Sequence, residues 1–487
     1  MAKLKQLLGK WLPAGGFARN VVTLMTGTTF AQVLLILVAP ILTRLYTPAD
    51  YGVFNLFTSI SSIIAVIACL RYEGAIVLPE KDKDAANVLT LCITICISIA
   101  IFILVIVALF SKSIADLLNA PSLSFWLWFM PLSIIVSGLF MALNYWSTRR
   151  KQFKRLAVRQ VTNSTVTAIT QISVGATLHI GPGGLIGGSL IGQLAATGRL
   201  AWQIYKDEGK QIVSFINKRS MKHVLSRYKN FPLYDSWSAL LNTSSNLLPA
   251  LLLAYFFNPV IVGLYALGNR VLAAPMGVIG NAVSQVFFPR AVEARRAGEL
   301  DYVALKMFNN LLSIGFVPIL LIAIVAPDLF RIVFGSEWIV AGEYVRWLSA
   351  FMLLAFISSP ISSIYSVMER QREGLIIYLF VFIIRLTALI IGGMKGDALL
   401  TVALFGISEA AFRLFNCCYI LHMAGVPVSD TIGSFIKQFL YTAPYALIPL
   451  LSWQLSHDSV VFVLSAIGAG ILFLIIKAYQ TKIAHVF

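Results

Sequence analysis

Long apolar segments alternate with short polar ones from one end of the chain to the other. Each apolar segment has about 20 or more residues, the length that an α-helix needs to cross the hydrocarbon core of a bilayer. The pattern therefore predicts an all-α polytopic membrane protein with roughly 12–14 transmembrane helices. The fourteen predicted spans are residues 21–46, 50–78, 84–110, 122–148, 154–178, 183–205, 231–257, 261–288, 302–326, 343–368, 373–395, 398–423, 435–456 and 458–479.

The stretch between the first two spans, residues 39–51 with the sequence APILTRLYTPADY, has a counterpart between the seventh and eighth. In both places one apolar segment ends and another begins after a few residues that include a proline. The matching residues, all 211 positions apart, are Pro48 and Pro259, Gly52 and Gly263, and Phe54 and Tyr265. Three such matches at one offset indicate an internal duplication, so we expect two six-helix repeats followed by two extra helices.

Positive charge is distributed asymmetrically between the loops. The basic segments are the N-terminus, with Lys3, Lys5, Lys10 and Arg19, and the loops at 149–155, 206–229, 290–296 and 370–372. All of them fall on one side of the predicted membrane, and loops such as 47–50 and 258–260 on the other side lack lysine and arginine. Because basic loops remain in the cytoplasm, we expect both termini to be cytoplasmic and the two repeats to be parallel.

This topology predicts four parts along the chain. They are an N-terminal lobe at residues 1–205, a basic cytoplasmic linker at 206–230, a C-terminal lobe at 231–424 and the two extra spans within 425–487. Ligands of such paired halves commonly bind in the cleft between them.

The composition argues against several classes of function. The net charge of +17 follows the positive-inside pattern, so it does not indicate nucleic-acid binding. The sequence has no Walker motif for a nucleotide and no large outer loop with paired carboxylates for acid–base catalysis. We therefore expect a transporter rather than an enzyme, and we predict no cofactor and no metal site.

Ionisable residues inside the predicted spans are the main candidates for function. Each costs about 2.5–3.5 kcal/mol on insertion scales, so each needs a partner or a water-filled cavity. The candidates are Arg71, Glu73, Arg159, Arg199, Asp235, Arg270, Arg385, Glu409 and Arg413, with Arg44 at the outer end of the first span. Arginines outnumber acids in this set, which favours an anionic ligand, because guanidinium groups bind phosphate oxygens in a bidentate geometry.

Depth in the membrane divides these candidates. Arg270, Arg385 and Arg413 lie deep within their spans. Arg71 and Arg159 lie nearer the cytoplasmic boundary, where a long side chain can extend to the headgroups. We expect Arg270 and Arg385, which have no acidic residue nearby in the sequence, to face a water-filled site for an anion.

Some of these residues can also pair with one another. Glu409 and Arg413 are four residues apart on one helix, the spacing of an ion pair, which fits a structural role and a functional one equally. Arg71 and Glu73 are two apart and would point to different faces of a helix, so we expect them to have different partners. Asn269 adds a polar group beside Arg270.

Residues 41–79, ILTRLYTPADYGVFNLFTSISSIIAVIACLRYEGAIVLP, closely resemble the opening of Wzx-type polysaccharide flippases, which belong to the multidrug/oligosaccharidyl-lipid/polysaccharide exporter superfamily. The specific features are the turn LYTPADYGVF and the sequence RYEGAIVLP that precedes a charged loop. Elsewhere the resemblance extends over the chain as the pattern of spans and the repeat.

The resemblance implies a V-shaped pair of six-helix lobes around a cationic cavity, working by alternating access. The substrate would be an undecaprenyl-diphosphate-linked oligosaccharide, moved from the cytoplasmic to the periplasmic leaflet of the bacterial inner membrane for O-antigen (lipopolysaccharide) or exopolysaccharide biosynthesis. Its partners would be that lipid-linked glycan, the lipid bilayer, and a polymerase and a chain-length regulator of the same pathway.

The resemblance also assigns roles to individual residues. Arg270 is similar in span and depth to an arginine that lipid II flippases use in their cavity. Ser59 occupies the matching position of the first repeat, so phosphate contacts from that half would come from Arg44, Arg71 or Arg199. The expected substrate-binding residues are Arg270, Arg385, Arg413, Arg199, Arg71, Arg44 and Asn269, and the expected coupling or ion-pair residues are Glu73, Asp235 and Glu409.

Two other functions remain open at this point. A cation-coupled multidrug exporter of the same superfamily would favour acidic residues in its lobes, whereas arginines predominate here. A membrane glycosyltransferase or ligase would need larger outer loops. Resistance to cationic dyes would indicate the exporter, and product formation from a labelled lipid-linked sugar would indicate the enzyme.

Overall fold

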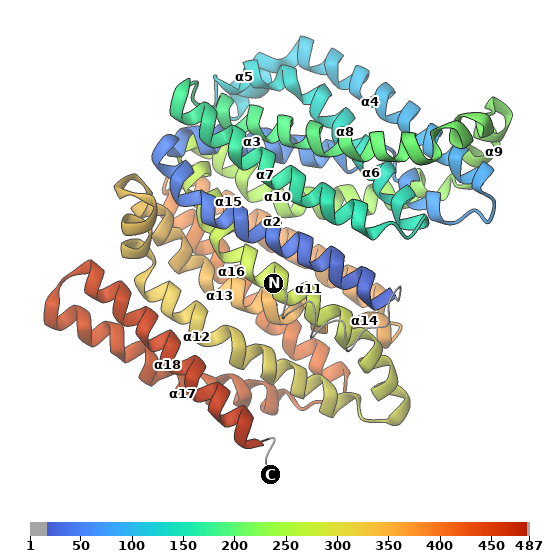
Figure 1. Cartoon of the computed structure of the whole chain (residues 1–487). Coiled ribbons are helices and arrows are strands. Elements are labelled where there is room, and N and C mark those ends of the chain that lie inside the picture. The colour runs from blue at the N-terminus through green and yellow to red at the C-terminus, as the bar shows by residue number, and fades with distance from the viewer. Residues whose placement is uncertain (1–16, 485–487) are drawn as a thin grey trace. The chain divides into compact units, whose positions relative to one another are not determined.

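The computed structural model describes residues 17–484 of the 487-residue chain (Figure 1). Lys3, Lys5 and Lys10, which contribute to the predicted orientation, lie outside the described residues. The long helices are α2 (Phe17–Leu45), α3 (Pro48–Ala65), α4 (Asp82–Leu117), α6 (Met130–Arg149), α7 (Phe153–Thr177), α8 (Pro182–Phe215), α10 (Ser236–Phe256), α11 (Pro259–Ala297), α12 (Leu300–Phe334), α13 (Ile339–Ile361), α15 (Gln371–Met394), α16 (Ala398–Met423), α17 (Val428–Ser456) and α18 (Ser459–Ala484). Short helical segments are η1 (Tyr72–Val77), α5 (Leu123–Trp126), η2 (Leu127–Phe129), α9 (Lys218–Arg227), η3 (Phe231–Asp235), η4 (Ser336–Trp338) and α14 (Ile364–Val367).

The all-α membrane fold predicted from the apolar segments is confirmed. Each predicted span coincides with helical structure, and the described residues contain no β-strand. Nine helical segments among them are long and apolar enough to cross a membrane: Thr26–Leu45, Asp82–Leu117, Leu123–Arg149, Phe231–Phe256, Leu300–Phe334, Ser336–Val367, Arg372–Met394, Ala398–Met423 and Ser459–Gln480. Many large apolar side chains are exposed, as with Leu109 of α4 at 69%, and a surface of that kind is compatible with lipid rather than water.

The second predicted span is not one continuous helix, and this expectation is wrong. α3 ends at Ala65, and the chain resumes helical structure only at Tyr72 in η1. Between them Leu70 and Arg71 adopt left-handed backbone conformations, with φ of 47° and 63°. A left-handed residue cannot continue an α-helix, so the chain changes direction at this point.

The chain divides into two compact units, Met1–Val262 (unit 1) and Gly263–Phe487 (unit 2). The division predicted at the linker 206–230 stays a prediction. The boundary between the two compact units follows α10, because α10 packs against α3 and η3 of unit 1.

In unit 1, α7 packs most extensively against α8 and α2 (Figure 1). Glycines of α8, spaced four residues apart, permit a close approach of α7 and α8. A Cβ atom added at Gly188 would lie 3.1 Å from the backbone nitrogen of Gln171 on α7, and one at Gly192 would meet Thr167. The hydroxyl of Tyr46 donates a hydrogen bond of 2.7 Å to the carbonyl oxygen of Gln171 and so fixes the end of α2 to α7.

The two proline turns that suggest the repeat have the same local construction. Pro48 and Pro259 are the first residues of α3 and α11. The backbone N–H that proline lacks has no partner within the helix at this position, so proline costs no hydrogen bond there. The Thr47 hydroxyl accepts from the backbone nitrogen of Asp50, and the Asn258 side chain accepts from that of Ile261. Both are N-terminal helix caps, which explains the sequences TPAD and NPVI.

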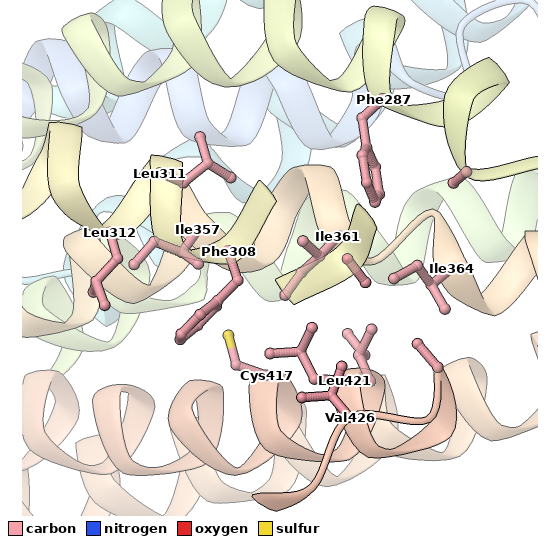
Figure 2. Packing of buried hydrophobic residues seen from close by; sticks show 14 of the residues in the cluster. Phe287, Phe308, Leu311, Leu312, Ile357, Ile361, Ile364, Cys417, Leu421 and Val426 are labelled. Carbon is pink, nitrogen blue, oxygen red and sulfur yellow. The ribbon is translucent and has the colours of Figure 1, made fainter. Parts of the chain in front are cut away.

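The core of unit 2 is a cluster contributed by α11, α12, α13 and α16 (Figure 2). Phe308 of α12 is fully buried, and Ile357 and Ile361 of α13 and Leu421 of α16 belong to the same cluster. α17 and α18 pack against α12 through a smaller cluster that includes Tyr445 and Phe473. This packing holds α13, α15 and α16 in place around the charged residues of unit 2.

Candidate functional site

Three charged residues predicted to be functional meet within unit 2. Arg385 of α15 donates from Nε to Glu409 Oε1 of α16 at 2.8 Å, and Arg413 Nε lies 3.4 Å from Glu409 Oε2. The side chains of Arg385 and Glu409 are 4% and 1% exposed, whereas that of Arg413 is 23% exposed. We call these three residues the 385–409–413 triad.

Aromatic rings surround the triad. The guanidinium carbon of Arg385 lies 5.8 Å from the ring centre of Phe405, and that of Arg413 lies 5.1 Å from the ring centre of Phe351. The two rings contact each other edge to face at 5.7 Å. Rings in these positions favour cations electrostatically and exclude water from one side of the triad.

The triad corrects one expectation and extends another. Arg385 does not face an anion site that lacks acids, because Glu409, 24 residues further along the chain, pairs with it. The pair expected between Glu409 and Arg413 is present, but Glu409 is shared by both arginines. The two guanidinium groups share one carboxylate, and Arg413 is the more exposed of the two cations.

Asn269 and Arg270 lie beside each other on α11, and both are partly buried. Asn269 follows Gly268, where an added Cβ would lie 3.1 Å from the carbonyl oxygen of Ala341 on α13. α11 and α13 are therefore in close contact at this level. The role of Asn269 and Arg270 in binding substrate stays a prediction.

In unit 1, Arg71 is the centre of a second charged cluster. It donates from Nε to Asp235 Oδ2 at 2.9 Å and from Nη1 to Glu73 Oε1 at 3.4 Å. Glu73 is 1% exposed, Arg71 28% and Asp235 45%. The cluster connects η1 with η3, at the start of the segment that leads into α10.

The expectation that Arg71 and Glu73 have different partners is wrong. It assumed an α-helix, in which residues two apart diverge, but Arg71 has a left-handed backbone and its side chain turns back to Glu73. Because Arg71 contacts two carboxylates, its charge is already balanced. The structure therefore gives Arg71 the surroundings of an ion-pair residue that joins two segments.

The two remaining arginines expected to bind phosphate, Arg44 and Arg199, both have exposed side chains. Arg199 of α8 donates to the hydroxyl of Thr162 on α7 at 3.3 Å. Exposure removes the energetic need for an anionic partner, since an exposed arginine can snorkel to the membrane surface.

A network of charges that the sequence argument missed lies where α6, α7 and α8 come together. Glu208 of α8 accepts hydrogen bonds from Trp146 Nε1 at 2.9 Å, Arg150 Nε at 2.8 Å and Arg155 Nη1 at 3.0 Å. Asp82 at the start of α4 pairs with Arg149 and Arg150. Part of the basic loop 149–155 is thus neutralised by acids that lie more than fifty residues away.

Replacing Glu208 by Gln should lower the thermal stability of the folded protein. The substitution removes the charge that three donors share, and hydrogen bonds to a charged group contribute about 1.5–3 kcal/mol each. The midpoint of thermal unfolding, followed by tryptophan fluorescence in detergent, measures the effect. Asp207→Asn is the matched control, because Asp207 pairs with Arg155 and is 52% exposed. Equal midpoints for the two variants would contradict this account of the network.

Arg159 of α7 is the second residue whose surroundings the sequence did not reveal. Its side chain is 9% exposed, and its guanidinium carbon lies 3.4 Å from the ring centre of Phe140 on α6. The guanidinium therefore packs against a ring of a neighbouring helix. The packing of Arg159 against another helix carries no signal in a single sequence.

The amino-acid sequence matches a known protein family. Residues 41–343, more than half of the chain, match the family described as polysaccharide biosynthesis protein. A relative from Klebsiella pneumoniae, described as an uncharacterized membrane protein in the cps region, is 23% identical over 463 residues, which cover 91% of each chain.

Solved structures share the fold. The lipid II flippase MurJ in an inward closed conformation aligns with a TM-score of 0.74 at 13% identity, covering 95% of this chain and 100% of that chain. An inward-facing multidrug resistance transporter of the MATE family, in the MOP superfamily, aligns with a TM-score of 0.60 at 15% identity, covering 82% of this chain and 98% of that chain.

The chain thus shares the polytopic helical fold of these two proteins. The chain belongs to the polysaccharide biosynthesis protein family. This match confirms the resemblance to polysaccharide flippases that residues 41–79 carry.

Proposed function

We propose that this protein is a flippase that moves undecaprenyl-diphosphate-linked oligosaccharide repeat units from the cytoplasmic to the periplasmic leaflet, by alternating access, for O-antigen or exopolysaccharide biosynthesis. The observation that carries the proposal is the 385–409–413 triad in a chain of this family. A diphosphate is the part of such a substrate that a net positive charge inside a membrane protein recognises.

The geometry of the triad gives its two arginines different roles. Arg385 holds Glu409 at 2.8 Å, so this carboxylate is already engaged when Arg413 meets a ligand. The Arg413 Nε atom lies 3.4 Å from Glu409 Oε2 and makes no hydrogen bond among the described residues, and Nη1 donates to Ser358 Oγ at 3.3 Å. Arg413 would therefore donate to a phosphate oxygen, while Arg385 acts as a positioning residue that fixes Glu409.

Arg270 and Asn269 complete the phosphate-binding set that we assign to unit 2. In unit 1, Glu73 and Asp235 would hold Arg71 and tie η1 to η3 during the transport cycle, or couple the cycle to an ion. A diphosphate carries about two negative charges, and in a cell with a negative interior each gains up to about 2.3 kcal/mol per 100 mV on outward movement. The membrane potential can therefore drive export of this substrate.

We place the protein in the bacterial inner membrane with both termini in the cytoplasm, because the basic loops lie on one side. A polymerase and a chain-length regulator would use the exported repeat units at the outer face.

Replacing Arg413 by Gln should abolish export while leaving the protein folded. The substitution removes a ligand-accessible charge but leaves the Arg385–Glu409 pair in place. In a host whose surface polysaccharide depends on this gene, we expect at least a tenfold loss of surface polysaccharide, a factor that corresponds to about 1.4 kcal/mol. Arg346→Gln is the matched control, since Arg346 forms an exposed pair with Glu343 on α13.

Normal surface polysaccharide in the Arg413→Gln strain would contradict the proposed role of the triad. The alternative function, a cation-coupled multidrug exporter, shares the fold with the MATE transporter but would bind cations. It predicts resistance to cationic dyes in the expressing strain, and no dependence of polysaccharide on Arg413.

A further inference from the structure

Arg159 is a buried cation without an acidic partner. Arg71, Arg149, Arg150 and Arg155 of unit 1 all pair with carboxylates. For Arg159, by contrast, no carboxylate among the described residues lies within ion-pair distance. Its Nε atom is buried and has no hydrogen-bond partner in the part of the chain that the structure describes, and Nη1 donates weakly, at 3.4 Å, to the side chain of the neighbouring Gln160.

Two further buried polar groups lie close to Arg159 by the register of the helices. On α7, Asn163 is one turn after Arg159, and its Oδ1 atom has no partner among the described residues. Arg199 of α8 contacts Thr162, which places Thr197 at the level of Asn163. The hydroxyl of Thr197 is likewise buried and without a partner there.

Contacts between α6 and α8 place Thr197 near Phe140 as well. Ser137 of α6 donates to Gln193 of α8 at 3.5 Å, and Trp146 donates to Glu208 further along both helices. α6 and α8 are therefore parallel, so Thr197, one turn after Gln193, faces the level of Phe140, one turn after Ser137. Phe140 supports the guanidinium of Arg159 from one side. The register of the helices thus places Arg159, Asn163 and Thr197 at one level between α6, α7 and α8.

The described contacts of the Arg159 guanidinium, one aromatic ring and one side-chain amide, do not offset the cost of burying its charge. Cation–π contact contributes about 0.5–2 kcal/mol, which is less than the cost of removing an arginine from water into a membrane protein. Buried polar atoms almost always have a partner, and here three lack one. Arg159 lies six residues after the start of α7, about 9 Å along the axis, a depth at which lipid phosphates are within reach of a long side chain.

We propose that Arg159 is the anion-binding residue of unit 1, and that it binds a phosphate ester group between α6, α7 and α8. The guanidinium donates from Nε to a phosphate oxygen, and the Thr197 hydroxyl supplies a second donor. The Asn163 amide can turn its NH2 group toward the same oxygen. This assignment replaces Arg44, Arg71 and Arg199, which are exposed or paired, and it deepens the proposed function by naming the phosphate contact of the first half.

Binding of three probes to the full-length purified protein in detergent tests the proposal. The probes are farnesyl diphosphate, phosphatidylglycerol and farnesol, and native mass spectrometry measures the bound fraction. We compare the wild-type protein with Arg159→Gln, Arg159→Lys, Thr197→Val and the control Arg199→Gln. Elution as a single species with wild-type helicity shows which variants are folded. If Arg159→Gln does not fold, Arg159→Lys, which keeps the positive charge, takes its place in the comparison.

We expect Arg159→Gln to weaken binding of a phosphate probe at least tenfold and Thr197→Val to weaken it less, while Arg199→Gln binds as the wild type does. Arg159→Lys should bind more weakly than the wild type, because it loses the planar fork. A loss confined to farnesyl diphosphate identifies the substrate as the source of the phosphate, and a loss confined to phosphatidylglycerol identifies a lipid headgroup. Either result supports the site.

Equal binding of both phosphate probes by Arg159→Gln and the wild type would overturn the inference, and so would a loss of farnesol binding in Arg159→Gln as large as the loss for a phosphate probe. The first result would leave the proposed function intact, because Arg413 and Arg270 could still hold the diphosphate. A wild-type protein that binds phosphatidylglycerol through Arg159 but no prenyl diphosphate would instead oppose the proposed function and leave the anion site standing. Binding of neither phosphate probe would oppose both.

Discussion

Replacing Glu409 by Gln should lower the stability of the protein more than any other single charge change in unit 2. Glutamine keeps the size of the side chain but removes the carboxylate that Arg385, which is 4% exposed, shares with Arg413. Breaking a buried ion pair by removing one partner costs about 3–5 kcal/mol. The midpoint of thermal unfolding in detergent should fall by roughly 5 °C or more.

Glu343→Gln is the matched control for this experiment. Glu343 pairs with Arg346 at 3.0 Å, but the two side chains are 33% and 45% exposed. Exposed pairs contribute about 0–1 kcal/mol, so the control should unfold close to the wild-type temperature. A midpoint for Glu409→Gln that matches the control would show that the triad does not depend on its carboxylate.

Replacing Gly52 by Ala should disrupt the fold of unit 1. A Cβ atom at Gly52 would lie 2.9 Å from the Cα atom of Pro259 and closer still to its carbonyl group. The backbone at the start of a helix cannot move aside, whereas the end of a flexible side chain can. Overpacking typically costs about 1–3 kcal/mol, and a clash with backbone exceeds that range. Size-exclusion chromatography should show loss of most monodisperse protein.

The control for Gly52 is a glycine on a helix of the same unit. Gly187 of α8 has no atom within 4 Å of an added Cβ, so Gly187→Ala should be neutral or stabilising, since alanine favours the helix by about 1 kcal/mol. Wild-type yield of Gly52→Ala would mean that α3 and the start of α11 are not in contact.

The helices could be predicted from the sequence because one physical requirement, the length of an apolar segment in a bilayer, dominates their pattern. The break after Ala65 could not, because IAVIACL continues the apolar pattern and does not indicate the left-handed backbone of Leu70 and Arg71. Turns that carry proline and a capping residue, such as TPAD, were visible because their local chemistry is specific.

The candidate site was predictable as a set of charges but not as a set of pairs. An ion pair four residues apart, Glu409 with Arg413, can be read from a helix. The pairs Arg385–Glu409 and Arg71–Asp235 join segments 24 and 164 residues apart, and only packing brings them together. The guanidinium of Arg159 packs against Phe140 of another helix, a contact that its place near the membrane boundary does not reveal.

Reconstituted transport tests the central claim most directly. The purified protein is placed in liposomes with a fluorescent short-chain oligosaccharide diphosphate lipid, and an impermeant quencher or glycosidase measures the fraction that crosses to the other leaflet. We predict crossing that depends on the protein, accelerates when the destination side is positive, and is lost in Arg413→Gln but kept in Arg346→Gln. Crossing at the rate of protein-free liposomes, or at the wild-type rate in Arg413→Gln, would contradict the assignment of the triad to the diphosphate.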